Sequence, residues 1–157
     1  MVLPPNMVVR ETLQDLLGRD IELTPTDPWA PTLRDPGAVA VYVNDGFRPS
    51  ALIACSLELA AAFSASIALV PAASVEESVA EGRLTKELEE NLSEVLNVLV
   101  GFFNRQHAPH VKLHEVYPPG SPAPVEVARR LRMLGDRSDL TLTVHGYGGG
   151  QLSIVVP

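Results

Sequence analysis

The strongest pattern in the chain is a helical alternation of polar and apolar positions between residues 84 and 104. A polar or small set recurs at steps of three and four residues: Glu87, Glu90, Glu94, Asn97, Gly101 and Asn104. An apolar set fills the positions between: Leu84, Leu88, Leu92, Val95, Leu96, Leu99, Val100 and Phe103. Residues three and four apart lie on one face of an α-helix, so the pattern predicts a long helix with one buried and one solvent-facing side. We expect Thr85 to cap this helix and Pro109 to follow its end, near residues 104–106.

The segments before this helix predict a mixture of helices and strands. In chain order we expect a helix at Val8–Leu17, a strand at Asp20–Thr24, a loop at Thr24–Pro36, strands at Gly37–Val43 and Pro49–Cys55, and a helix from about Leu57 to Leu69. The turn residues Asn44, Asp45 and Gly46 favour an antiparallel hairpin between the second and third strands. Residues 75–82 are compatible with a helical turn or with a loop.

The segments after the long helix predict a further strand, a helix and a terminal hairpin. They are a strand at Val111–Val116, a Pro-rich loop at Pro118–Pro124, a helix at Val125–Leu134 with Gly135 as its C-terminal cap, and strands at Leu140–Val144 and Leu152–Val156 joined through Gly146–Gly150. The order favours an α+β fold, with helices packed on a mainly antiparallel sheet. Neither an internal repeat nor a linker divides the 157 residues, so we expect one domain over residues 1–157.

Composition and charge narrow the classes of function. A hydrophobic fraction of 46% and a charged fraction of 20% are typical of a globular protein. The net charge is −7, and the densest basic cluster, Arg129, Arg130 and Arg132, is short, so we expect it on the outer face of a helix and expect no nucleic-acid partner. The single Cys55 lies in an apolar run and excludes an internal disulfide.

The compartment is predicted from the same features. No signal peptide is visible at the N-terminus, and residues 51–74 are long enough to span a membrane but contain Glu58 and Pro71. We interpret that segment as a strand followed by a buried helix, and expect a cytoplasmic protein without a membrane partner.

The polar stripe resembles the signature of the CheC and CheX type chemotaxis phosphatases. In that signature a glutamate is followed after three positions by an asparagine, then by a glycine one turn later and by a proline some twenty residues beyond. Glu94, Asn97 and Gly101 match the first three, and Pro119 lies 22 positions after Asn97. A single copy of the motif looks more like the CheX type. The residue four positions before Glu94 is Glu90, where the family usually has Asp or Ser.

The resemblance implies a function in two-component signalling. The partner would be a phosphorylated, CheY-like response regulator, whose own acidic pocket holds Mg²⁺, so that no cofactor or metal is expected in this chain. Asn97 would orient a water for attack on the aspartyl phosphate, and Glu94 would pair with the partner's phosphate-contacting lysine. Glu90, Gly101 and Asn104 would belong to the docking face, with Gly101 allowing close backbone approach.

Other interpretations stay open at this point. The same fold also serves related flagellar switch proteins, so a non-catalytic interaction module is the alternative. His107, His110 and His114 have spacings that occur among metal ligands, although Pro109 separates them and surface positions are favoured. Trp29 is either a core residue or an interface anchor. Edge strands in such a sheet can also pair two chains, which leaves a homodimer open.

Overall fold

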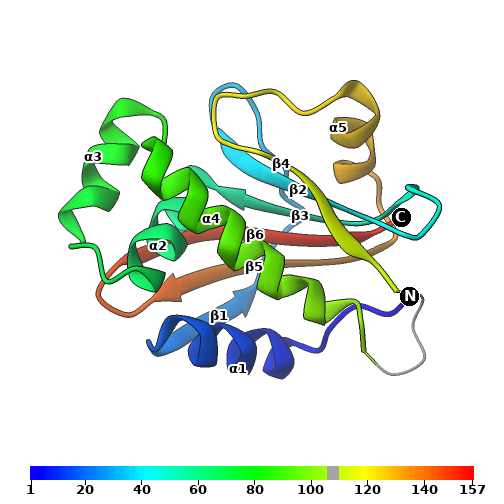
Figure 1. The fold of residues 1–157 in the computed structure, drawn as a ribbon, viewed down its shortest axis with the longest axis horizontal. Coiled ribbons are helices and arrows are strands. Elements are labelled where there is room, and N and C mark those ends of the chain that lie inside the picture. Colours follow the sequence, from blue (N-terminus) through cyan, green and yellow to red (C-terminus); the bar gives the residue numbers. More distant parts are fainter. Residues whose placement is uncertain (106–109) are drawn as a thin grey trace.

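The structure is a computed structural model and describes residues 1–105 and 110–157. In chain order the elements are α1 (Asn6–Leu17), β1 (Ile21–Pro25), β2 (Gly37–Val43), β3 (Pro49–Ser56), α2 (Leu57–Ile67), α3 (Ala73–Glu81), α4 (Lys86–Val98), the 3-10 helix η1 (Leu99–Phe102), β4 (Lys112–Tyr117), α5 (Val125–Leu131), β5 (Asp136–Val144) and β6 (Gly148–Val156). Figure 1 shows the helices arranged around a twisted sheet.

The sheet has six strands in the order β1-β5-β6-β3-β2-β4, and every pair is antiparallel. The expected hairpins β2–β3 and β5–β6 are both present. They come together through the pairing of β3 with β6, where Leu52 lies opposite Val155. The predicted α+β class with a mainly antiparallel sheet is therefore confirmed.

Both faces of the sheet are covered, which explains why β2 is apolar throughout. Alternate residues of a strand point to opposite faces. Ala38, Ala40 and Tyr42 join the larger core beneath α1, α2 and α4, whereas the intervening valines join a smaller core beneath α5. Trp29 packs against that smaller core, and its indole N–H donates to Asp35 Oδ2 at 2.7 Å. Of the two roles left open for Trp29, the structure supports the core position.

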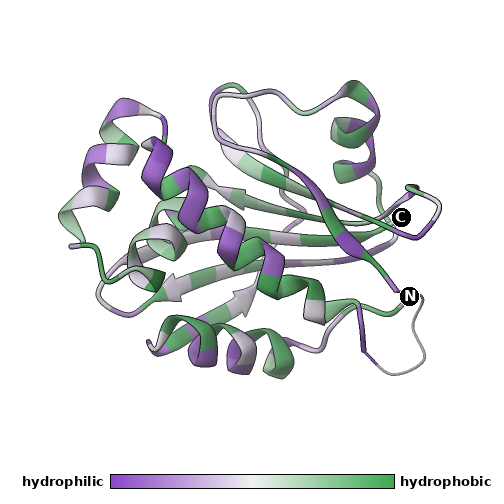
Figure 2. Cartoon of the chain, in the orientation of Figure 1, coloured by the Kyte–Doolittle hydropathy of each residue, from purple (hydrophilic) through white to green (hydrophobic). Residues whose placement is uncertain are grey.

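Helix α2 forms a buried middle layer between the sheet and α4. Ser56 caps it by accepting a hydrogen bond from the backbone N–H of Leu59, and every residue from Leu59 to Ser66 is buried. Small side chains on β2 and β3, such as Ala40 and Ala51, let this Ala-rich helix approach the sheet closely. Helix α4 then lies across α2 in Figure 1. As a result, the apolar side of α4 packs against the core and its polar side faces solvent (Figure 2).

The predicted end of α5 is wrong by three residues. The helix ends at Leu131 rather than Leu134, and its last residue is followed by Arg132 rather than by a Gly135 cap. The cause is a side chain from β5: the Arg137 guanidinium donates to the backbone carbonyls of Leu131 and Met133, at 2.7 and 2.9 Å. These carbonyls are satisfied by the arginine, so no glycine cap is needed.

The glycine run does not form the predicted connection. Strand β5 begins at Asp136 rather than Leu140, and β6 begins at Gly148, so Gly149 and Gly150 are strand residues. A Cβ on Gly150 would lie 2.1 Å from Ser56 Oγ, and a Cβ on Gly149 would lie 1.8 Å from the Leu142 carbonyl oxygen. The two glycines are therefore needed for close approach of β6 to α2 and to β5.

Two further predictions are decided by the structure. Residues 73–81 form the helix α3, which selects the helical alternative for that segment. Residues 51–74, considered as a membrane span, divide into β3, α2 and the start of α3. Within the described residues, no helix is both long enough and apolar enough to cross a membrane.

Candidate functional site

The candidate site is the outer face of α4, whose helix begins as the sequence predicts. Thr85 Oγ1 accepts a hydrogen bond from the Leu88 N–H at 3.2 Å, and Glu87 and Glu89 lie in the first turn, where the helix dipole favours carboxylates. The buried residues Leu88, Leu92, Val95 and Leu96 hold the opposite side of the helix against the core. The site therefore rests on a rigid, capped element.

The structure places Glu90, Glu94, Asn97 and Gly101 together on the exposed side. Glu94 and Asn97 are one turn apart on the same face, as the spacing predicts. Within the part of the chain that the structure describes, neither side chain takes part in a hydrogen bond or an ion pair. Both groups are thus free to bind a partner.

Gly101 has no packing partner that would require a glycine. It lies in η1 and is exposed, and a Cβ built on it would have no atom of the described residues within 4 Å. Its backbone is not in the left-handed region, so conformational freedom does not require glycine either. What a glycine does provide here is an open approach to the helix from outside.

Asn104 is separated from this face. Its amide group donates to the Val111 carbonyl and accepts from the Val111 N–H, each at 2.8 Å, and the side chain is half-buried. The amide thus holds the segment that leads into β4. The Asn104 amide is therefore engaged within the chain, unlike the Glu94 and Asn97 side chains in the described residues.

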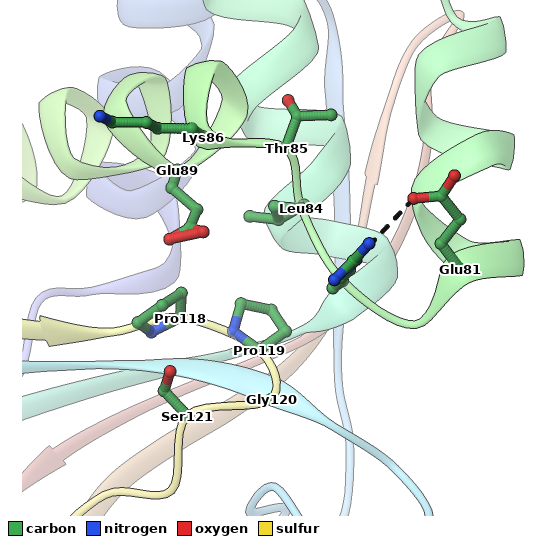
Figure 3. A pocket seen from close by; sticks show the side chains of 10 residues that line it. Glu81, Leu84, Thr85, Lys86, Glu89, Pro118, Pro119, Gly120 and Ser121 are labelled. Carbon is green, nitrogen blue, oxygen red and sulfur yellow. Dashed lines mark ion pairs between the residues drawn. The ribbon is translucent and has the colours of Figure 1, made fainter.

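A groove flanks the first turn of α4, on the side of the loop that follows β4 (Figure 3). Its volume is about 490 Å³. It is lined by Glu81, Arg83, Leu84, Thr85, Lys86, Glu89, Pro118, Pro119, Gly120 and Ser121. Pro119, the proline of the signature, is buried, and so the spacing of 22 residues brings it beside the same helix.

The charges around the site are mainly negative. Glu87, Glu90 and Glu94 are exposed on α4, and α3 adds further exposed carboxylates. Two cations, Arg83 and Lys86, lie at the start of α4, where Arg83 Nε lies 4.0 Å from Glu81 Oε2. Such a face attracts a cationic feature of a partner.

The histidines do not form a site in the described structure. His110 and His114 are exposed, and the His114 ring lies 6.3 Å from the Phe47 ring, edge to face. His107 lies outside the described residues. The described residues also contain no cluster of three or more His, Cys, Asp or Glu side chains suited to a metal ion.

One residue behind the site was not found from the sequence. Tyr42 on β2 is fully buried, and its hydroxyl donates to the Leu96 carbonyl oxygen at 2.6 Å, next to Asn97. The only sequence signal is a large, polar-tipped residue in a strand otherwise made of Gly, Ala and Val. That signal does not identify the partner of the hydroxyl.

Comparisons with known proteins establish the fold. No protein-family model and no curated protein sequence matches the chain. Among solved structures, it is similar to the FliM middle domain from Vibrio alginolyticus, at 13% identity over 95% of this chain and 86% of that chain, with a TM-score of 0.58. FliM in the FliG–FliM complex from H. pylori aligns at 11% identity over 96% and 85% of the two chains, with a TM-score of 0.54.

A looser likeness links the chain to a chemotaxis protein. It aligns with a chain of the CheX–CheY–BeF3–Mg²⁺ complex from Borrelia burgdorferi at 15% identity over 93% of this chain and 90% of that chain, with a TM-score of 0.49. The FliM alignments confirm the predicted resemblance at the level of the fold, which chemotaxis phosphatases and flagellar switch proteins were expected to share.

Proposed function

We propose that the outer face of α4 docks onto a phosphorylated response regulator and promotes hydrolysis of its aspartyl phosphate. The observation that carries the proposal is the placement of Glu94 and Asn97, one turn apart, exposed and without partners in the described structure, on a helix fixed from behind. Phosphoryl transfer depends mainly on positioning, and a rigid pair of this kind is suited to that task.

Asn97 would act on the attacking water. Its neutral amide can accept a hydrogen bond from the water through the carbonyl oxygen and donate one through the N–H groups. The oriented water attacks phosphorus, the bond between phosphorus and the aspartyl oxygen breaks, and the products are the free carboxylate and inorganic phosphate. The Mg²⁺ that stabilises the phosphate charge would be supplied by the partner's acidic pocket.

Glu94 would position the partner. Its carboxylate would pair with the lysine that contacts the phosphate in the partner, and this contact would fix the register of the two proteins. Glu90, one turn before Glu94, would extend the negative face. Gly101, one turn beyond Asn97, would let the partner approach the helix backbone.

The proposal is tested by measuring dephosphorylation across a panel of response regulators from the same genome, each phosphorylated with a small phosphodonor. Wild-type protein should accelerate phosphate loss from at least one regulator. Asn97→Ala should remove this acceleration while leaving binding within about twofold, because the water-orienting amide is lost but the docking charges remain. If no regulator in the complete panel loses phosphate faster, the catalytic proposal fails.

A second candidate is a non-catalytic binding module. It is favoured by the similarity of the fold to the FliM middle domain and by Glu90, which stands where the phosphatases usually have Asp or Ser. A third carboxylate near a phosphate is unfavourable unless it is paired. Binding that is equally tight to the phosphorylated and unphosphorylated regulator, and that survives Asn97→Ala without any turnover, would select this candidate.

A further inference from the structure

One buried side chain contacts the chain on both sides of η1, the short helix that follows the docking face. The Tyr42 hydroxyl donates to the carbonyl of Leu96, three residues before η1 begins, at 2.6 Å. The Tyr42 ring lies 5.1 Å from the ring of Phe103, the residue after η1 ends. Tyr42 therefore links the sheet to both ends of the junction.

This junction is where α4 changes its geometry. The α-helix ends at Val98, and the chain continues as a 3-10 helix over Leu99–Phe102. A change from α to 3-10 winding alters the rotation per residue, so the winding between Asn97 and Gly101 sets how these two residues face a partner. A 3-10 turn is common at the C-terminus of an α-helix, and here that turn carries Gly101. The relative orientation of the two signature residues thus depends on what holds the junction.

The sheet is irregular at the same tyrosine. Tyr42 pairs with Ala51 and Val43 with Pro49, so β3 contains an additional residue, Ser50. On the other side of β2, Val41 pairs with Glu115 and Tyr42 with Leu113, so β4 contains the additional residue His114. Both neighbouring strands therefore carry a bulge beside Tyr42. Bulges bend a strand and change the direction of its side chains, and they are frequent beside active sites.

The hydrogen bond from the Tyr42 hydroxyl to the Leu96 carbonyl is suited to hold these two residues together. Tyr42 is fully buried, and burial raises the pKa of its phenol well above the usual value, so the hydroxyl keeps its proton and remains a donor. A carbonyl near a helix end has spare acceptor capacity. Because water is excluded from this position, the bond has no competing partner.

We infer that Tyr42 is a positioning residue for the docking face: through the Leu96 carbonyl it fixes the junction between α4 and η1, and thereby the orientation of Asn97 relative to Gly101. The structural part of this inference stands on the contacts of Tyr42 alone. Its consequence for catalysis rests on the proposed function. The two parts are tested separately.

The structural part is tested by amide hydrogen exchange in Tyr42→Phe, which removes one hydroxyl and keeps the ring. Exchange should become about five- to tenfold faster for residues 97–103, in line with the loss of one buried hydrogen bond, and stay unchanged for residues 86–92. Tyr117→Phe on β4 is the matched control, because that hydroxyl makes no hydrogen bond within the described chain. Unchanged exchange in Tyr42→Phe, or equal acceleration over all helices, would overturn the inference.

The catalytic part is tested with a regulator that the wild-type protein dephosphorylates. Tyr42→Phe should lower kcat about five- to tenfold with KM within about twofold, because docking charges are kept while the water-orienting geometry loosens. Tyr117→Phe should change neither value. Localised exchange without any change in kcat would overturn the positioning role and leave the proposed function intact. If no regulator responds to the wild type, the proposed function fails, and the exchange experiment still decides whether Tyr42 holds the junction.

Discussion

Arg137 and Asp139 lie two residues apart on β5 and form a buried ion pair. Alternate residues of a strand share a face, and here that face is covered by α5 and by the segment around Trp29. The guanidinium donates to the carboxylate at 2.7 and 2.9 Å, and the two side chains are only 7% and 4% exposed. Asp139 also accepts hydrogen bonds from the backbone N–H of Trp29 and from the hydroxyl group of Ser153. One carboxylate therefore joins a helix-capping arginine, a loop and two strands.

Removing the carboxylate should destabilise the fold strongly. Asp139→Ala leaves Arg137 buried without its counter-ion, and we expect the free energy of unfolding to fall by about 3–5 kcal/mol. Burial alone would raise the pKa of Asp139, but the hydrogen bonds from Arg137, Ser153 and Trp29 outweigh it and lower this pKa. Urea unfolding at neutral pH measures the loss.

The same carboxylate predicts a pH dependence. A lowered pKa in the folded state stabilises the protein above the pKa of the unfolded chain, about 3.9, and this contribution is lost as the pH falls through the folded value. The unfolding free energy of the wild type should therefore decline below about pH 5. Asp139→Asn should show a shallower decline, whereas the exposed Asp136→Asn serves as the control and should follow the wild type. Parallel curves for Asp139→Asn and wild type would refute the assignment.

Charge reversal at Glu94 should act on docking rather than on folding. The side chain is exposed and has no partner in the described structure, so Glu94→Lys should change the unfolding free energy by less than about 0.5 kcal/mol. It would place like charges opposite the partner's lysine, and we expect Kd to rise about 10- to 100-fold. Glu11→Lys, the same change on the exposed side of α1, should leave Kd unaltered. Kd is measured by titrating each variant with the regulator. If Glu94→Lys and Glu11→Lys raise Kd equally, binding depends only on the net charge of the protein.

Gly101 tests whether close approach is needed at the end of the docking face. Among residues 1–105 and 110–157, no atom lies within 4 Å of a methyl group placed there, so Gly101→Ala should leave the unfolding free energy unchanged or raise it by up to about 1 kcal/mol. Docking should weaken about threefold with alanine and more with Gly101→Leu, because each side chain holds the partner away. Calorimetric titration of the two variants measures this, and equal affinity of Gly101→Leu and wild type would exclude close approach.

The elements that the sequence predicts well are those with local signals. Helices α2 and α4 each have an N-terminal cap residue and an apolar pattern, and the β2–β3 hairpin has an Asn-Asp-Gly turn. The predicted end of α4 near residues 104–106 is wrong, because the α-helix stops at Val98 and the last turn winds as the 3-10 helix η1 to Phe102.

The errors occur where contacts between elements decide. Helix α5 ends early because Arg137 on β5 binds its terminal carbonyls. Gly150 is a strand residue because it pairs with Leu142 of β5, and its missing side chain leaves room for Ser56. Ser56 is far from β6 in the sequence, so no window around β6 contains that contact. Arg137 is only six residues from Leu131, but a local pattern does not show that its side chain turns back to the helix end.

The candidate site likewise contains residues that local sequence signals place and residues that only tertiary contacts place. The spacing of Glu94 and Asn97 is enough to place them together, because the helix is regular between them. The same spacing places Asn104 on the predicted helix, but in the structure the chain winds as a 3-10 helix from Leu99 to Phe102, and the Asn104 side chain bonds to Val111. Tyr42 is 54 residues from its partner Leu96, so its role depends on tertiary packing alone.

Because helix α2 is buried beneath α4, the residues on the outer side of α4 contribute little to the stability of the fold. Since α4 is held through its inner residues against α2 and β2, its outer residues contribute little to the packed core. We therefore expect substitutions at the exposed positions Glu87, Glu90, Glu94 and Asn97 to change the free energy of unfolding little, so that this face can vary while the fold is kept.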